Sequence, residues 1–343
     1  NMFAALKKVK ANRGAGGTDG ISVEEIDGYL KENWVDIRDR IRKRKYKPQP
    51  VRRVEIPKPN GGVRSLGIPT VVDRIIEQAM AQVISPIAEK QFSEYSYGFR
   101  PKRRTQQAVV KLLEYLNDGY TYIVDIDLEK FFDNVPHDKL MSLVHKLIND
   151  PDTESLIRKY LNAGVMIKGE YAKTTMGTPQ GGNISPLLSN IMLNELDREL
   201  EARGLRFVRF ADDCVIAVGS SAAANRVMAS VTGFIEKKLG LKVNASKSKV
   251  TKPMNLKYLG FGFWKDKDRW KARPHKDSIK RFERKLKAKT KRNWSVSIDQ
   301  RIAELNQLIR GWINSFRMGN MKSTLRRIDE HLRTRMRIVI WKQ

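Results

Sequence analysis

Two adjacent aspartates, Asp212 and Asp213, constrain the fold of this chain more than any other feature. They stand between two apolar, strand-like runs at residues 207–210 and 214–218. Two short strands joined by so few residues form a tight antiparallel hairpin, which places both carboxyl groups at its tip. Adjacent carboxylates repel each other, and their burial is costly without compensation. Because apolar strands flank the acids on both sides, the pattern indicates a cation site more than an ordinary polar turn.

A third acid, Asp127, ends another apolar run that begins at residue 122 and is typical of a buried strand. Carboxylate oxygens are hard ligands that suit magnesium, which shares its remaining positions with water and substrate phosphates. Two such ions ~3.5–4 Å apart can hold the attacking and the leaving oxygen of a phosphoryl transfer. We therefore expect Asp127, Asp212 and Asp213 to meet at one point and to bind two Mg²⁺ ions, for which Mn²⁺ is an allowed substitute.

The charge of the chain indicates a polyanionic partner. It holds 66 Lys and Arg against 38 Asp and Glu, a formal net charge of +28. Each neutralised phosphate releases counterions and adds affinity, which favours nucleic acid over an anionic membrane. No apolar stretch approaches the ~20 residues of a membrane span, and the N-terminus lacks a signal-peptide pattern. Cys214 is the only cysteine, which excludes a disulfide framework and fits an intracellular protein.

The front and middle of the chain mix the two periodicities. Helical stripes lie between strand-like runs in an irregular order, which favours an α+β domain over a doubly wound sheet. A further alternating segment, residues 53–68, surrounds a probable turn at Asn60-Gly61 and predicts a β-hairpin. The helical stripes cover residues 75–84, 108–116, 140–148 and 224–239.

The last part of the chain is basic and helical. Residues 265–343 hold 24 Lys and Arg against 8 Asp and Glu, so they carry +16 of the net charge. Three apolar stripes with helical spacing predict three amphipathic helices, with breaks near 293–299 and 318–322. This change in composition predicts a domain boundary near residues 265–278 and a small basic helical bundle after it.

Three motifs carry a resemblance to a known family. Phe210-Ala211-Asp212-Asp213 resembles the aromatic-Ala-Asp-Asp box of reverse transcriptases, with Phe in place of the more frequent Tyr. Residues 178–190 (TPQGGNISPLLSN) resemble the Pro-Gln-Gly box in its group II intron form, and residues 127–133 (DLEKFFD) match the first catalytic motif. The match runs in order from about Arg13 to the C-terminus. The chain thus resembles a group II intron-encoded reverse transcriptase and maturase of the bacterial type.

This resemblance implies a right-hand polymerase fold of the α+β class, with an antiparallel palm sheet packed on helices. It implies an N-terminal extension and fingers with part of the palm at residues 1–120, a palm with the catalytic motifs at 121–265, and a helical thumb or maturase-specific domain at 266–343. We expect no endonuclease domain, since four His and one Cys could not supply its zinc ligands.

The resemblance also implies roles around the two ions. Phe132 resembles the steric gate, a ring that would clash with a 2′-hydroxyl and so select deoxynucleotides. The backbone carbonyl of Leu128 is placed to be a further metal ligand beside the incoming nucleotide, and Gln180 is expected to contact its sugar region. Asp125 and Asp133 are expected to play supporting or structural roles.

Basic residues and two further segments complete the predicted site. Lys58 and Arg64 flank the hairpin turn and are expected to hold the triphosphate, because a guanidinium suits bidentate phosphate contact. Lys247 resembles the lysine that protonates the pyrophosphate leaving group, a contribution of roughly 10²–10⁴-fold, although Lys249 is close enough to leave this assignment open. The residues expected to contact primer or template, or in the first segment to organise the palm, are Arg100, Arg103, Tyr258, Leu259 and Gly260.

The sequence therefore predicts an RNA-directed DNA polymerase that copies RNA into cDNA and binds its intron RNA to assist splicing. Its expected partners are an RNA template, the group II intron RNA, a DNA primer and dNTPs in the bacterial cytoplasm, whereas homodimer formation stays open. The alternative is a splicing cofactor without polymerase activity, which the three acids disfavour. An RNA-dependent RNA polymerase would normally carry a small residue in place of Phe132.

Overall fold

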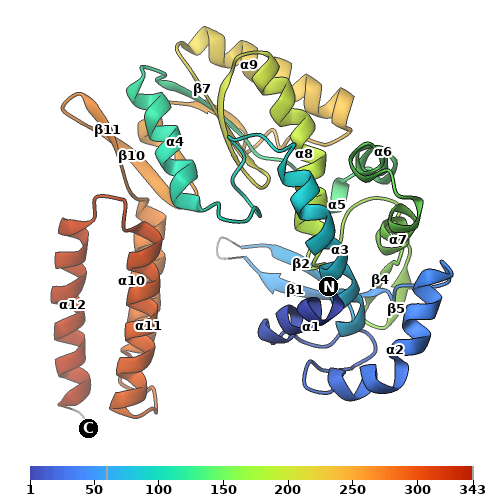
Figure 1. Cartoon of the computed structure of the whole chain (residues 1–343). Coiled ribbons are helices and arrows are strands. Elements are labelled where there is room, and N and C mark those ends of the chain that lie inside the picture. The colour runs from blue at the N-terminus through green and yellow to red at the C-terminus, as the bar shows by residue number, and fades with distance from the viewer. Residues whose placement is uncertain (59–60, 342–343) are drawn as a thin grey trace.

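The computed structural model describes residues 1–58 and 61–341. An N-terminal part with a small sheet and a C-terminal helical bundle lie on opposite sides of the molecule, and a central sheet with its helices joins them (Figure 1). This arrangement confirms the predicted α+β class and the right-hand outline. No helix of the described residues is long and apolar enough to cross a bilayer.

The central sheet is antiparallel and has the order β6-β7-β3-β8. Its strands were all predicted as apolar runs except the short β8. The strands are β3 (Tyr122–Ile126), β6 (Arg206–Phe210), β7 (Asp213–Val218) and β8 (Lys249–Thr251).

Helices cover both faces of this sheet, which explains why apolar residues of its strands point to both sides. Val124 and Ile216 belong to the main core, together with residues of α8 and α9. Ile123 and Val215 point the other way and pack with residues of α4, as the two-residue period of a strand requires. The predicted stripes at 108–116 and 224–239 are thus confirmed as helices. The covering helices are α4 (Thr105–Asn117), α8 (Ser185–Ala202) and α9 (Ser221–Phe234), the last continued by a π-helical turn, η1 (Ile235–Leu239).

The N-terminal part holds a second sheet of order β2-β1-β4-β5. Strands β1 and β2 form the predicted antiparallel hairpin, with Val54 opposite Leu66. Of its predicted turn, Asn60 lies outside the described residues, and Gly61 has a φ of 85°. The strands are β1 (Val51–Pro57), β2 (Val63–Ile68), β4 (Val165–Ile167) and β5 (Glu170–Ala172).

Helix α3 (Val71–Glu89) connects the N-terminal part to the palm. It buries residues on most of its surface, including Ile75 and Ile76 in a cluster with α1 and α2 and Ile84 in the main core. The predicted stripe at 75–84 lies inside it. The remaining helices of the first two parts are α1 (Met2–Ala11), α2 (Ile26–Arg42), α5 (Phe131–Asn134), α6 (His137–Ile148) and α7 (Pro151–Leu161).

The C-terminal bundle has the three predicted helices. Phe282 stacks on Trp312 with ring centroids 4.5 Å apart, and Leu286, Leu305 and Ile328 complete a small core. A hairpin precedes the bundle and ends at Pro274, so the first helix begins close to the predicted boundary; the exact domain limits stay predictions. The elements are η2 (Pro253–Asn255), β9 (Lys257–Tyr258), β10 (Phe261–Asp266), β11 (Arg269–Pro274), α10 (Lys276–Lys289), α11 (Ile298–Phe316) and α12 (Lys322–Ile340).

Candidate active site

The tip of the β6–β7 hairpin brings the three predicted acids together. Phe210 pairs with Asp213, which leaves Ala211 and Asp212 as a two-residue turn. Ala211 has a φ of 57°, a left-handed conformation that is uncommon for a residue other than glycine. In the neighbouring strand pair Ile126 lies opposite Cys214. Asp127 follows Ile126 and Asp213 precedes Cys214, so both acids lie at the same end of this pair. Three acids distant in the sequence are therefore neighbours at one end of the palm sheet.

Desolvation and the neighbouring acid charges raise the pKa values of Asp212 and Asp213. Desolvation by the surrounding protein, and then the charges of Asp212, Asp125 and Asp127, raise the pKa of Asp213 to about 7, even though part of this side chain meets solvent. Burial, and then the charge of Asp127, also raise the pKa of Asp212, which Arg64 opposes. The raised pKa values show that the protein leaves this negative charge only partly compensated.

The donor set at the tip fits a hard divalent cation. It offers carboxylate oxygens, the ligands that Mg²⁺ prefers, and their repulsion would be relieved by positive charge. Within residues 1–58 and 61–341, however, no three His, Cys, Asp or Glu side chains already form a closed ligand set. The acids in this structure thus form an electrostatic cluster, and metal binding by Asp127, Asp212 and Asp213 stays a prediction.

A loop from residue 244 to residue 248 wraps around Asp127. The Asn244 amide donates to the Asp127 carbonyl at 2.8 Å, and the Asp127 amide donates to Ser248 Oγ at 3.0 Å. This loop places Lys247 Nζ 3.4 Å from Asp127 Oδ1. Lys249 instead lies opposite Asp125 in the sheet. The geometry therefore favours Lys247 over Lys249 as the predicted proton donor.

Asp125 is closer to the site than the sequence suggested. It points to the same side of β3 as Asp127, two residues on. Burial raises the pKa of Asp125 to about 6, which the charge of Lys249 opposes and that of Asp127 supports. Asp125 therefore adds to the electrostatic cluster from behind, in agreement with the supporting role expected for it.

Phe132 and Gln180 line one open cavity of about 410 Å³ beside strands β1, β2 and β4, together with Arg53. Phe132 is half-buried and packs edge-on against Phe131, with ring centroids 5.4 Å apart. Of the described residues that line this cavity, none is one of the three acids. The structure therefore brings the predicted gate and Gln180 together, while their relation to the acids stays a prediction.

Glycines hold the Pro-Gln-Gly loop against strand β2. The Gly67 amide donates to the Gln180 carbonyl at 2.9 Å. Gly181 has a φ of 136°, and a Cβ there would lie 2.3 Å from the Gly67 carbonyl oxygen. A side chain would thus be strained twice, by conformation and by contact. Gly181, the first of the two glycines after Gln180, is therefore required for the loop to approach the sheet.

Glu77 supports the same loop from below, and sequence reasoning missed it. It is 2% exposed and accepts a hydrogen bond from the Asn183 amide, which follows the two glycines. Burial raises the pKa of Glu77 to about 8. The signal in the sequence is an acid within the apolar helical stripe at 75–84, which is an expensive position for an ionised group.

We expect Glu77→Gln to change how stability depends on pH. A carboxyl whose pKa rises from 4.5 unfolded to about 8 folded binds more protons in the folded state between these values. The free energy of unfolding of the wild type should therefore fall as pH rises from 5 to 8, by up to a few kcal/mol. Urea unfolding at both pH values should show a smaller fall in the free energy of unfolding for Glu77→Gln than for the wild type. The control Glu24→Gln, at an exposed position, should show the same fall as the wild type. Equal slopes in all three proteins would contradict the burial of a protonated Glu77.

The predicted triphosphate ligands lie on the β1–β2 hairpin. The charge of Arg64 opposes the rise in the pKa of Asp212. The Arg64 guanidinium is therefore close enough to act on the acid cluster. The Lys58 amide donates to the Gly62 carbonyl at 2.9 Å, and the Lys58 side chain is exposed. Leu128 lies between two backbone hydrogen bonds to residues 242–244. The roles of all three residues stay predictions.

The structure favours one of the two roles expected for Arg100. Its side chain is in the interior, with an ion pair of 2.9 Å to Glu89 and hydrogen bonds to the carbonyl oxygens of Ser93 and Ser96. The loop before it turns these carbonyls inward, where they need a donor. These contacts favour the organising role expected for Arg100 over the template contact, and both stay predictions. Arg103 stays near the surface, with its guanidinium over the Tyr97 ring.

The predicted primer-contacting turn is present, but one of its side chains is buried. Leu259 and Gly260 have φ of 49° and 85° and join β9 to β10 as a two-residue turn. Tyr258 is 2% exposed and its hydroxyl donates to the Val208 carbonyl, so its side chain packs inside the palm, and the primer contact expected of this turn stays a prediction. A Cβ at Gly260 would lie 3.3 Å from Phe316 of α11. The turn thus rests against the thumb.

Comparison with protein families decides what the chain is related to. The family described as "Reverse transcriptase (RNA-dependent DNA polymerase)" matches residues 56–263. The chain belongs to the reverse transcriptase family. Residues 279–343 also match the family described as "Group II intron, maturase-specific domain", so this reverse transcriptase is of the group II intron form. Together the two matches include all three acids and most of the thumb.

Named relatives agree with this assignment. YkfC of Escherichia coli K12 is 35% identical over 272 residues, which cover 68% of this chain and 71% of that protein. The group II intron-encoded protein LtrA of Lactococcus lactis subsp. cremoris is 38% identical, over 60% of this chain and 34% of LtrA. A putative COX1/OXI3 intron 2 protein of Saccharomyces cerevisiae is 27% identical, over 97% of this chain and 45% of that protein. The chain spans less than half of the latter two relatives.

Solved structures support the reverse transcriptase fold. The telomerase of Candida albicans, solved with a fragment of telomeric RNA, aligns with a TM-score of 0.55 at 13% identity, over 88% of this chain and 59% of the telomerase. The telomerase of Candida tropicalis gives a TM-score of 0.52 at 14% identity. At this level of identity the likeness concerns the fold alone.

Proposed function

We propose that this chain is the RNA-directed DNA polymerase of a group II intron, which copies RNA into cDNA and binds its intron RNA to assist splicing. The observation that carries the proposal is the cluster of Asp127, Asp212 and Asp213, where desolvation and then the neighbouring acid charges raise the pKa of Asp213 to about 7 in a strongly basic chain. A pure RNA-binding protein gains nothing from concentrated negative charge, which would repel its ligand.

In the proposed site, Asp127, Asp212 and Asp213 would hold two Mg²⁺ ions, with the Leu128 carbonyl as a further ligand. When bound, such ions neutralise charge that develops on the transferring phosphate. The three acids supply hard oxygen donors, which supports magnesium over zinc. Manganese also prefers hard oxygen ligands and is the expected substitute.

The surrounding residues would bind the incoming nucleotide and handle the proton. Lys58 and Arg64 hold the triphosphate by charge, Gln180 contacts the sugar region, and the Phe132 ring excludes a 2′-hydroxyl. Lys247, with its Nζ 3.4 Å from Asp127 Oδ1, donates a proton to the departing pyrophosphate. Such a positioned acid contributes roughly 10²–10⁴-fold.

The basic thumb would hold RNA. Residues 265–343 carry 24 Lys and Arg, and many of them are exposed on α10 and α12, where phosphate contact releases counterions. The proposed partners are the template–primer duplex and the intron RNA. The turn at Leu259 and Gly260, together with Arg103, would lie against the primer and template.

The direct test is primer extension on an RNA template. We expect the purified chain to extend a DNA primer with dNTPs and Mg²⁺, and we expect Asp127→Asn to lose this activity while its RNA affinity is unchanged. RNA binding by both proteins without any extension would favour the alternative function, a splicing cofactor that keeps the polymerase fold as a scaffold.

A further inference from the structure

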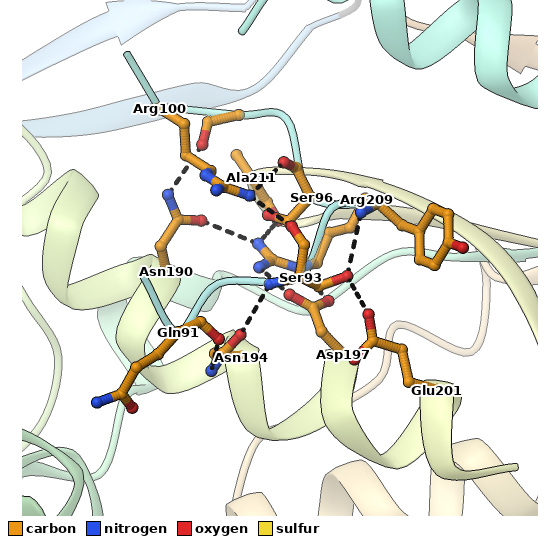
Figure 2. Close-up of polar contacts among 12 residues, drawn as sticks. Gln91, Ser93, Ser96, Arg100, Asn190, Asn194, Asp197, Glu201, Arg209 and Ala211 are labelled. Carbon is orange, nitrogen blue, oxygen red and sulfur yellow. Dashed lines mark hydrogen bonds and ion pairs between the residues drawn. The ribbon is translucent and has the colours of Figure 1, made fainter. Parts of the chain in front are cut away.

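An ion pair is buried directly behind the hairpin tip. Arg209 precedes Phe210 at the end of β6, and Asp197 lies on α8; the two residues are both 0% exposed. Arg209 Nε donates to Asp197 Oδ1 at 2.7 Å, and its Nη2 donates to Asp197 Oδ2. Figure 2 shows this pair surrounded by polar side chains of α8 and of the loop before α4. A charged pair gains little stability from such a position compared with apolar side chains of similar volume.

The third nitrogen of the guanidinium points at the catalytic turn. Arg209 Nη1 donates to the Ala211 carbonyl oxygen at 2.9 Å and to Asn190 Oδ1 at 3.0 Å. That carbonyl belongs to the peptide bond that links Ala211 to Asp212. The orientation of this peptide bond therefore fixes the backbone rotation at Asp212. It also fixes the direction in which the Asp212 side chain leaves the backbone.

The turn is held from its other side as well. Asn190 Nδ2 donates to the Gly98 carbonyl at 2.9 Å. A Cβ at Gly98 would lie 2.1 Å from the Ala211 amide nitrogen, so the loop before α4 presses its backbone on the turn. Ala211 itself has a φ of 57°, a strained conformation that persists only where neighbouring groups fix it. These contacts supply that constraint.

Helix α8 links this network to the nucleotide side of the site. It begins at Ser185, whose hydroxyl donates to the Pro179 carbonyl next to Gln180 at 2.8 Å. Asn190 and Asp197 follow one and three turns later on the same helix. One rigid element thus positions the Pro-Gln-Gly loop at its start and the acid-bearing turn along its length.

We propose that Arg209, held by Asp197 and Asn190, is a positioning residue that sets the orientation of Asp212 through the Ala211 carbonyl. The proposal rests on the proposed polymerase function for its consequence, but its structural part concerns the hairpin alone. If Arg209 served only to fill the core, an apolar pair of similar size would replace it without effect on the turn.

The test replaces the pair by apolar residues in the double variant Arg209→Met with Asp197→Leu. Removal of both charges together leaves no unpaired ion in the interior, so the protein should stay folded and bind RNA as before. We expect amide hydrogen exchange in a peptide covering residues 207–215 to be at least tenfold faster. We also expect primer extension to fall at least tenfold and to need severalfold more Mg²⁺ for half of its maximal rate.

Ile157→Ala is the matched control, because Ile157 is fully buried in the same core on α7, which contributes no side chain to the network. It should lower the melting temperature without a change in hairpin exchange or Mg²⁺ dependence. If the double variant does not fold, Arg209→Lys replaces it: a lysine keeps the charge beside Asp197 but cannot hold Asp197 and Ala211 together, so it should show the same changes.

Unchanged exchange at residues 207–215 and unchanged Mg²⁺ dependence in a folded variant would overturn the positioning role. A wild-type protein that fails to extend primers would instead refute the proposed function. The exchange measurement distinguishes these two failures, because it reports on the turn whether or not the protein is a polymerase.

Discussion

Asp212→Ala is expected to reduce primer extension by at least about 10³-fold, because several kcal/mol of transition-state stabilisation depend on the metal that this carboxylate would hold. Asp212 makes no ion pair in the described residues and contributes no apolar packing to the core, so its loss should leave the fold unchanged. Removal of one negative charge would weaken the repulsion of RNA phosphates and so would not lower the affinity for RNA. We therefore expect RNA affinity within about twofold of the wild type.

The matched control is Asp268→Ala, which removes the same charge from the exposed turn between β10 and β11. It should keep both activities. Single-nucleotide incorporation and filter binding at one fixed salt concentration measure the two quantities. Full synthesis by Asp212→Ala would disprove the metal assignment, whereas parallel loss of synthesis and RNA binding would point to a damaged fold.

Phe132→Ala is expected to let the site accept ribonucleotides. The Phe132 ring is half-buried and held edge-on by Phe131 and by Phe99, whose centroid is 6.5 Å away. A ring fixed in this way can exclude a 2′-hydroxyl by contact, a discrimination worth roughly 10–200-fold for a single small group. Its truncation should reduce the preference for dNTPs over NTPs by that factor while dNTP incorporation continues.

Phe132→Tyr serves as the control, because it keeps the ring in place and should keep the preference. Incorporation of a single dNTP and of the matching NTP, each as kcat/KM, gives the ratio directly. If Phe132→Ala leaves this ratio at the wild-type value, the ring is an ordinary packing residue and another group selects the sugar.

Local sequence pattern predicted much of the fold. The strands of the palm and the helices of the thumb are amphipathic or fully apolar over several residues, and such periodicity depends on the chain alone. The hairpin that carries Asp212 and Asp213 was predictable because so few residues join its strands. The meeting of Asp127 with Asp212 and Asp213 was predicted from their shared chemistry, whereas the strand register that brings it about was not, since pairing of distant strands is not encoded in either strand.

The roles of single basic and polar residues were less predictable. Arg100 was expected either at a template or as an organiser of the palm, and Tyr258 in a turn at the primer, and the side chains of both are interior groups that satisfy backbone carbonyls. In a chain with 66 Lys and Arg, the sequence alone does not distinguish a buried arginine from an exposed one. Glu77 and Arg209 were missed for the same reason, because a buried charge is recognised by what surrounds it.

The sequence by itself determined the periodic elements, the basic thumb and the three acids, because these depend on residue type and spacing. The tertiary structure alone decided which charges face solvent and which support the catalytic turn from inside. Burial and hydrogen-bond partners arise from segments far apart in the chain, and only the folded packing of α3, α8 and the palm sheet brings those segments together.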